Sequence, residues 1–185
     1  MAAITQPRLV KFICGMISAR AELFDLAQER LTELLGPVDI SSDVLPFDFT
    51  TYYDEEMGRP RLRKFLAFER LIDPGELAGV KRATNGLEDF FARAQARAQP
   101  AGPARPINLD PGYLVQSRLI LASMKDFSHR IYLADGVFAE VTLQYRDGWQ
   151  ALPWTFPDYG SGRYFPFFDA VRARLREQEM QEVSP

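Results

Sequence analysis

The sequence predicts an α+β protein in which a mainly antiparallel sheet carries helices packed on one face. Segments typical of strands and helices follow one another as strand, helix, strand, strand, helix, strand, which is the order of a ferredoxin-like first half. The pairs Asp135-Gly136 and Asp147-Gly148 then separate three strand-like segments, which predicts a C-terminal β-meander. A charged amphipathic segment at 165–178 predicts a final helix.

The length and the composition indicate one globular domain. The chain has 185 residues, of which 46% are hydrophobic and 25% are charged, so disorder of the whole chain is excluded. We expect a single domain over residues 8–178, with flexible tails at 1–7 and 179–185. An Ala-, Pro- and Gln-rich stretch at 95–106 predicts an exposed connector within that domain.

Charge and cysteine usage exclude several classes of protein. A net charge of −3 argues against a general nucleic-acid-binding function. Cys14 is the only cysteine, so no internal disulfide can form, and its apolar neighbours predict a buried thiol. No stretch reaches the roughly 20 apolar residues of a membrane-spanning helix. We therefore expect a cytoplasmic protein without membrane association.

The first half of the chain contains two strand-like runs around a helix. Residues 8–17 are typical of a buried strand, and Ser18 is a suitable N-cap because leucines follow it at helical spacing. Gly36-Pro37 is a typical stop signal for that helix. The segment 43–49 predicts a short edge strand, since a proline interrupts it, and 63–72 predicts a further strand.

The second half begins with a strong helix start at 73–76, which combines an acidic cap with a proline at the first helical position. Residues 107–113 predict a strand followed by a turn. The run 114–124 fits either a helix or a buried strand, and the polar residues Gln116 and Arg118 favour a short helix. The three strands of the predicted meander are 129–134, 137–145 and 149–152.

The hairpin around Asp135-Gly136 carries the densest set of reactive groups in the chain. With a two-residue turn, Leu133 faces Phe138, and His129 lies diagonally opposite Glu140 on the same face. A carboxylate beside an imidazole fixes its tautomer, which suits acid–base catalysis, so these two residues are the candidate catalytic pair. A polar cross-strand contact without catalysis is the alternative, and a bulge at the turn changes the register.

Four further polar side chains are candidate ligand-binding residues. Lys125 and Arg130 flank the histidine and suit a phosphate, the arginine as a fork of donors and the lysine as a point charge. Asn108 and Asp110 alternate on one face of their predicted strand. For Asp110, which precedes a proline, a turn-capping role is the alternative.

An acidic, tyrosine-bearing loop supplies candidate metal ligands. Asp48, Asp54 and Glu56 offer the hard carboxylate oxygens that Mg²⁺ takes, often together with substrate phosphates. A solvated acidic loop is the alternative. One histidine and one cysteine cannot build a His/Cys zinc site. The phosphate-binding patterns Gly-x-x-x-x-Gly-Lys-Ser/Thr and Gly-x-Gly-x-x-Gly do not occur, and neither does the hydrolase pattern Gly-x-Ser-x-Gly.

Four phrases of the sequence, at 46–58, 65–72, 108–114 and 125–133, resemble a bacterial family of unknown function, DUF4416. The resemblance covers residues 11–174. Proteins of this family often carry a GTP-binding label, and the resemblance implies no catalytic residues. Because no P-loop is present, such a label requires a different kind of nucleotide site.

Two functions fit these features. In the first, the chain binds a phosphorylated small molecule or a nucleotide, GTP included, in a pocket without a P-loop, and His129 with Glu140 transfers a proton. In the second, a non-catalytic module binds a protein partner through its acidic and aromatic loops, at Tyr52-Tyr53 and 154–159. The first is favoured, because charged groups of both signs gather near one hairpin.

Overall fold

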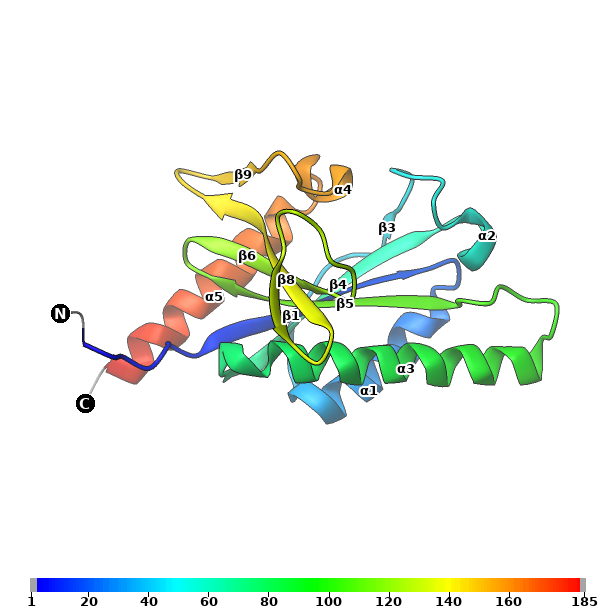
Figure 1. Ribbon diagram of the computed structural model, residues 1–185, viewed down its shortest axis with the longest axis horizontal. Coiled ribbons are helices and arrows are strands. Elements are labelled where there is room, and N and C mark those ends of the chain that lie inside the picture. Colours follow the sequence, from blue (N-terminus) through cyan, green and yellow to red (C-terminus); the bar gives the residue numbers. More distant parts are fainter. Residues whose placement is uncertain (1–2, 184–185) are drawn as a thin grey trace.

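The computed structural model describes residues 3–183, which form an antiparallel sheet flanked by helices (Figure 1). The strand order is β2-β4-β1-β5-β6-β8-β7, with β3 paired to β4 and β9 paired to β8. The strands are β1 (Val10–Ser18), β2 (Val38–Ser41), β3 (Leu45–Pro46), β4 (Leu62–Ile72), β5 (Ile107–Val115), β6 (Arg118–Ser123), β7 (Ile131–Ala134), β8 (Val137–Tyr145) and β9 (Trp149–Ala151).

The helices are α1 (Glu22–Leu35), α2 (Asp54–Met57), α3 (Leu77–Ala98), α4 (Pro157–Gly160) and α5 (Phe165–Val183). A 3-10 turn at Pro74–Glu76 leads into α3, and Asp73 caps it by accepting a hydrogen bond from the Gly75 N–H. Of the helices described, none combines the length and the apolar content that a membrane span requires.

The first half of the fold has the predicted ferredoxin-like arrangement. The elements β1, α1, β2, β4, α3 and β5 follow one another, and their strands lie in the order β2-β4-β1-β5, every neighbouring pair antiparallel. β1 lies in the middle and is buried along its whole length. The predicted meander is present as β7, β8 and β9. The α+β class and the antiparallel sheet are therefore confirmed.

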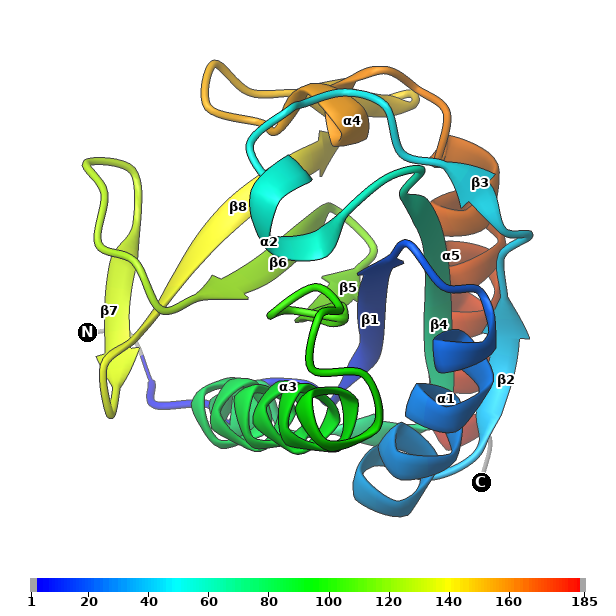
Figure 2. The same cartoon turned by 90° about the vertical axis from the view of Figure 1, so that its right-hand side faces the viewer.

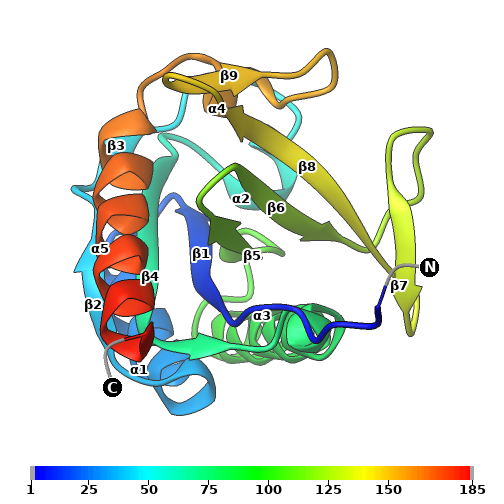
Figure 3. The same ribbon diagram turned by 90° about the vertical axis from the view of Figure 1, so that its left-hand side faces the viewer.

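Helices cover both faces of the sheet, whereas the sequence predicted them on one face. α1 and α3 pack on the face that Phe12, Cys14 and Met16 of β1 present. α5 packs on the other face, where Ile13 of β1 and Phe65 of β4 join its apolar residues. Figures 2 and 3 show α5 and α3 on different sides of β1 and β4. Because successive residues of β1 point to opposite faces and are nearly all apolar, both faces need cover.

The ends of two helices differ from the prediction. α3 continues through Ala98, so the connector begins at Gln99 rather than at 95, and both Gln95 and Pro106 are buried. α5 runs to Val183 and so includes most of the tail predicted at 179–185. Residues 3–9 have no regular structure, and the other predicted tail residues, 1–2 and 184–185, lie outside the described part of the chain.

Three other local predictions were wrong. Ser18 does not cap α1, and its hydroxyl donates instead to the Pro106 carbonyl at 2.7 Å. The strand predicted at 43–49 is reduced to the short β3, and the longer β2 precedes it. The run 114–124 contains the end of β5 and the strand β6 rather than a helix.

β7 contains a bulge that changes the predicted register. Ala134 pairs with Val137 as expected, but Tyr132, rather than Leu133, pairs with Phe138. Leu133 is the additional residue, so every position before it is displaced by one. The strand begins only at Ile131, which leaves His129 in the preceding turn.

The separation of β6 from β5 creates the space for a site. β6 pairs with β5 only from Gly112 to Val115, so the first half of β5 has no strand neighbour on that side. Gly112 permits the close approach where pairing starts, because a Cβ atom there would collide with the Ile120 carbonyl. Pro111 lies just beyond the last pair, where no ladder hydrogen bond to β6 is lost. The turn predicted here is therefore continuous strand.

Two side chains of α3 take the place of the missing strand beside β5. Lys81 Nζ donates to the Leu109 carbonyl at 2.9 Å, and Glu88 Oε1 accepts from the Leu109 N–H at 2.7 Å. Lys81 and Glu88 are seven positions apart, so they lie on one face of the helix. The main chain of β5 is thereby satisfied while the space next to it stays open.

Candidate ligand-binding cavity

A cavity of about 740 Å³ lies beside the open edge of β5. Residues of α3, β6, β8, α4 and the loop before α2 surround it, and Figure 2 shows these elements arranged around one region. Small-molecule sites typically measure roughly 300–1,000 Å³, so the volume suits a small ligand. The charged lining residues are Arg63, Lys81, Glu88, Asp89, Arg105, Asp110, Lys125, Arg130, Glu140 and Asp158.

Arg63 of β4 is a buried cation at the floor of the cavity. Its side chain is 2% exposed, its Nη1 lies 3.3 Å from Asp110 Oδ2, and its Nη2 donates to Asp158 Oδ2 at 3.0 Å. The guanidinium carbon lies 4.9 Å from the ring centre of Phe65 and 5.1 Å from that of Tyr159. A buried charge needs opposite charges close by, and the two carboxylates supply them.

Several polar atoms near Arg63 have no hydrogen-bond partner within residues 3–183. They are Arg63 Nε and the hydroxyls of Tyr159 and Tyr164, all of them buried. Tyr159 lines the cavity, and burial raises its pKa well above the ordinary value. Burial also raises the pKa of Asp158, which Arg63 opposes. Buried polar groups are nearly always satisfied in proteins, so an unpaired group that lines a cavity is a candidate ligand contact.

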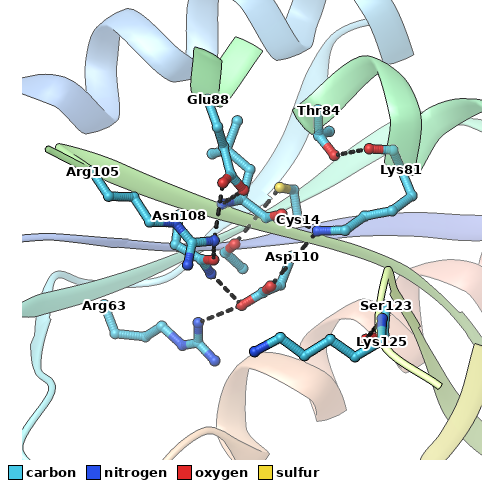
Figure 4. A network of polar contacts seen from close by, with 12 residues as sticks. Cys14, Arg63, Lys81, Thr84, Glu88, Arg105, Asn108, Asp110, Ser123 and Lys125 are labelled. Atoms are coloured by element: carbon cyan, nitrogen blue, oxygen red, sulfur yellow. Dashed lines mark hydrogen bonds and ion pairs between the residues drawn. The ribbon is translucent and has the colours of Figure 1, made fainter. Parts of the chain in front are cut away.

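Only one of the two carboxylate oxygens of Asp110 in β5 accepts hydrogen bonds from the described residues. Its Oδ2 accepts a hydrogen bond from Asn108 Nδ2 at 2.6 Å as well as the Arg63 contact. Its Oδ1 accepts no hydrogen bond from the described residues, and Lys81 Nζ is 4.0 Å away. Figure 4 shows Arg63, Lys81 and Lys125 extending toward this carboxylate from different directions.

Glu88 and Arg105 form the edge of the cavity near α3. Arg105 Nη2 donates to Glu88 Oε2 at 3.0 Å and also to Asn108 Oδ1. Burial raises the pKa of Glu88, and the charges of Lys81 and Arg105 oppose this effect. The pair therefore ties the connector after α3 to the floor strand β5.

The loop between β6 and β7 contributes two cations in different environments. Arg130 is nearly buried: its Nε donates to Glu140 Oε2 at 2.8 Å, and its Nη1 donates to Ser123 Oγ and to the Lys125 carbonyl, each at 2.8 Å. Its Nη2 donates no hydrogen bond within the described range. Lys125 is exposed and donates to the Tyr52 hydroxyl at 3.0 Å, and it forms no ion pair with any described carboxylate.

The imidazole and the carboxylate of the predicted catalytic pair do meet. His129 Nε2 lies 3.0 Å from Glu140 Oε2, although the bulge in β7 removes the register on which the prediction depended. The imidazole stacks on Trp154, with ring centres 5.2 Å apart and planes 9° apart, and Phe127 lies beside it. Glu140 lines the cavity but His129 does not. The histidine therefore contacts the outer side of Glu140.

The structure does not bring the three candidate metal ligands together as a site. Each carboxylate is close to an arginine: Asp54 pairs with Arg59 and Arg61, Asp48 pairs with Arg163 at 3.0 Å, and Glu56 lies 3.7 Å from Arg105. Across residues 3–183, no group of three or more His, Cys, Asp or Glu side chains is arranged to hold a metal ion. The loop carboxylates are thus matched by cations of the protein itself.

Several predicted residues line the same cavity, and several other lining residues were missed. Those predicted are Asn108, Asp110, Lys125, Arg130 and Glu140. Those missed are Arg63, Lys81, Glu88, Arg105 and Asp158. Arg63 had a detectable signal, because a charge two positions before the buried Phe65 shares its inward face. Lys81 and Glu88 had a weaker one, since both lie on the helix face that carries the buried residues.

The fold and the cavity define an α+β protein with a polar, aromatic-rich interior site that contains no P-loop. The sequence profile of the family described as "Domain of unknown function (DUF4416)" matches residues 8–175, so the chain belongs to that family. No curated protein and no solved structure matches the chain. The family resemblance seen in the sequence is therefore confirmed.

Proposed function

We propose that the protein binds a phosphorylated small molecule, such as a nucleotide, in the cavity beside β5. The observation that carries the proposal is Lys125, a lining residue whose ammonium has no carboxylate partner in the described chain. Arg130 is bonded to the carbonyl of the same residue and keeps its Nη2 unused. Both residues line the cavity, and an ammonium and a guanidinium that face one cavity can bind a phosphate together.

The distribution of charge supports placing the phosphate at the loop between β6 and β7. Arg63 is already matched by two carboxylates, and Arg105 is matched by Glu88. A phosphate at those cations has to displace a buried ion pair, which is unfavourable. At Lys125 it replaces only contacts with Tyr52, which are the hydrogen bond to the hydroxyl and the position of the ammonium 5.1 Å from the ring centre, so this end of the cavity is the favourable one. Magnesium enters the proposal only as a counter-ion that accompanies the phosphates.

The pair formed by His129 and Glu140 serves to position Arg130 in this proposal. Glu140 accepts from Arg130 and lies beside His129 through Oε2, and its Oε1 accepts from the Thr142 hydroxyl at 3.2 Å. Both oxygens are thus occupied. The histidine itself is separated from the cavity by this carboxylate, so we propose ligand binding rather than proton transfer as the role of the site.

A thermal-shift and calorimetry screen tests the proposal, with inorganic phosphate, pyrophosphate, sugar phosphates, GTP and ATP, each with and without Mg²⁺. A ligand that binds the native state at 100 times its Kd stabilises it by about 2.7 kcal/mol. We expect at least one phosphate to raise the Tm of the wild type and of Lys64→Met equally, and that of Lys125→Met by clearly less, because tenfold weaker binding removes about half of this stabilisation. Lys64 is the matched control, because its ammonium pairs with Asp25 and does not line the cavity. Equal shifts in all three proteins, or none in the wild type, contradict the proposal.

A protein-binding module is the second candidate, and the edge strand β7 favours it. Its side chains are exposed on both faces, with Ile131 at 73% and Tyr132 at 59%, and it is the last strand on its side of the sheet. An exposed apolar edge strand is a template for a further strand. Of the loop aromatic residues named from the sequence, Tyr52, Trp154 and Phe156 are exposed and Tyr159 is buried. If β7 pairs with a second copy of the chain, sedimentation will show a dimer that Ile131→Lys abolishes, and a monomer at all concentrations excludes that pairing.

A further inference from the structure

The cavity contains an acceptor and a donor that the protein leaves largely unused, side by side. Asp110 Oδ1 accepts no hydrogen bond from residues 3–183. Lys81 Nζ, which is 4.0 Å from it, donates to the Leu109 carbonyl and retains further N–H groups. Both residues line the cavity, and Figure 4 shows their polar atoms approaching one another there.

The orientation of the Asp110 carboxylate is fixed by its neighbours. Asn108 Nδ2 and Arg63 Nη1 both bind to Oδ2, and they come from β5 and β4, two strands of the rigid sheet. Rotation of the carboxylate would break both contacts. Oδ1 is therefore held toward the cavity as a preorganised acceptor, which lowers the entropy cost of binding a donor.

The nearby charges select against a cationic ligand group at this position. An amine that binds to Asp110 would bring its ammonium close to both Lys81 and Arg63, and like charges repel strongly in a partly buried site. A neutral N–H next to a neutral acceptor avoids this repulsion, because the acceptor takes a hydrogen bond from Lys81. The edge of a nucleobase has this combination of groups.

The remaining walls of the cavity suit a flat ring. Phe49, Tyr53 and Phe156 line it, and Tyr53 is held by an edge contact with Tyr52, their ring centres 5.0 Å apart. Aromatic rings can stack on any of the nucleobases, and such stacking contributes about 1–3 kcal/mol per base. A sugar phosphate without a base has no flat face to offer these rings.

We propose that the ligand is a nucleotide whose base places an N–H at Asp110 Oδ1 and a neighbouring acceptor at Lys81 Nζ. The phosphate then lies toward Lys125 and Arg130. This inference rests on the proposed function and adds to it the class of the ligand and the residue that recognises the base.

The test compares nucleotides with a matched compound that lacks the base. Calorimetry measures the binding of GMP, AMP, UMP, CMP and ribose 5-phosphate to the wild type, Asp110→Asn and Asp43→Asn. In Asp110→Asn, Arg63 and Asn108 keep the remaining oxygen, so the new amide nitrogen replaces the acceptor with a donor. Asp43→Asn makes the same chemical change at an exposed carboxylate that does not line the cavity, and it serves as the control.

We expect at least one nucleotide to bind the wild type and Asp43→Asn at least about tenfold more tightly than ribose 5-phosphate, the difference that one hydrogen bond to a charged group produces. Asp110→Asn is expected to lose that advantage while it binds ribose 5-phosphate as before. Ribose 5-phosphate binding as tightly as every nucleotide overturns the inference on the wild type alone, and leaves the proposed function standing. An equal loss for all compounds in Asp110→Asn also overturns it. Failure of all five compounds to bind overturns this inference, and the thermal-shift screen with pyrophosphate, GTP and ATP then decides separately whether the proposed function stands.

Discussion

Lys11 of β1 and Arg63 of β4 are two buried cations on the same face of the sheet. Each needs carboxylates and hydrogen-bond acceptors to offset its burial, and the two obtain them in different ways. Lys11 Nζ donates to Asp39 Oδ2 at 2.7 Å, to the Phe68 carbonyl at 2.9 Å and to Gln178 Oε1 at 3.0 Å. All three N–H groups of the ammonium are used. Burial lowers the pKa of Lys11, and Asp39 opposes that shift.

Arg63 is equally buried but is not saturated. Its two carboxylates, Asp110 and Asp158, both line the cavity, and its Nε has no partner in the described residues. Asp110 Oδ1 also has no hydrogen-bond partner in the described residues and lies at the cavity, whereas Asp39 Oδ1, the unpaired oxygen beside Lys11, is buried and does not line it. Around Lys11, α5 closes the structure, whereas around Arg63 the divergence of β6 from β5 leaves a space.

Burial of a charged side chain alone therefore does not identify a binding site. A buried ion pair is often a structural element with no net gain over apolar packing. Residual hydrogen-bonding capacity next to an open volume is the feature that distinguishes the surroundings of Arg63 from those of Lys11.

The largest expected effect is on stability. Arg63→Met leaves Asp110 and Asp158 without their cation, and removing one partner of a buried pair costs about 3–5 kcal/mol. Lys11→Met is expected to cost less, because Asp39 retains Arg174, whose Nε lies 3.3 Å from Oδ2. Urea unfolding measures both. The double variant Arg63→Met/Asp158→Asn should recover part of the loss, and a larger loss for Lys11→Met than for Arg63→Met contradicts the distinction.

A smaller effect is expected on phosphate affinity at the rim of the cavity. Lys125→Met removes one charged contact and should weaken phosphate binding about tenfold or more. His129→Ala leaves Arg130 bonded to Glu140, so we expect a loss of less than about threefold, which is under 1 kcal/mol. Calorimetry with the phosphate that stabilises the wild type measures both. If the histidine variant loses binding as completely as the lysine variant, His129 contacts the ligand directly.

Much of the fold could be predicted because its signals are local. Asp135-Gly136 adopts the positive φ values of its turn, and Asp147-Gly148 does the same. The ferredoxin-like order followed from the alternation of apolar runs. The apolar run of β1 indicates that both faces of the sheet need cover, but the second helical layer was not predicted, because the sequence of α5 does not reveal the face on which it packs. The bulge at Leu133 had no sequence signal either.

The site could be predicted only in part, for a related reason. Asp110, Lys125 and Arg130 were predicted because each lies in or next to a strand or hairpin that is recognisable from the neighbouring sequence. Arg63 and Lys81 were missed because their role depends on β6 leaving β5 at Gly112, a contact between distant parts of the chain. The pairing of His129 with Glu140 was predicted, but through a register that the bulge changes.

A third prediction concerns pH at the α3 side of the cavity. Burial raises the pKa of Glu88 above the ordinary value of 4.5, so the folded state binds this proton more strongly than the unfolded state does. The resulting stabilisation is complete below pH 4.5 and is lost as the pH rises through the raised pKa. Glu88→Gln keeps an acceptor for the Leu109 N–H but does not titrate. The Tm of the wild type minus that of Glu88→Gln should therefore fall as the pH rises above 4.5, and a difference that increases contradicts the assignment.

The smallest expected signal comes from Cys14, which lies under the floor of the cavity on the α1 and α3 side of β1. The thiol is fully buried, and burial together with the charge of Asp110 raises its pKa, so both access and thiolate formation are suppressed. A thiol reagent at neutral pH should not label the native wild type on the time scale of minutes, and should label the unfolded chain at once. Arg63 lowers the pKa of this thiol, so the loss of its charge alone would slow labelling. Because Arg63→Met is expected to destabilise the sheet more than Lys11→Met does, local opening should nevertheless make labelling under native conditions faster in Arg63→Met. Equal acceleration would mean that the sheet opens as one unit. The structural difference between the surroundings of Lys11 and those of Arg63 would then have no effect on how the sheet opens.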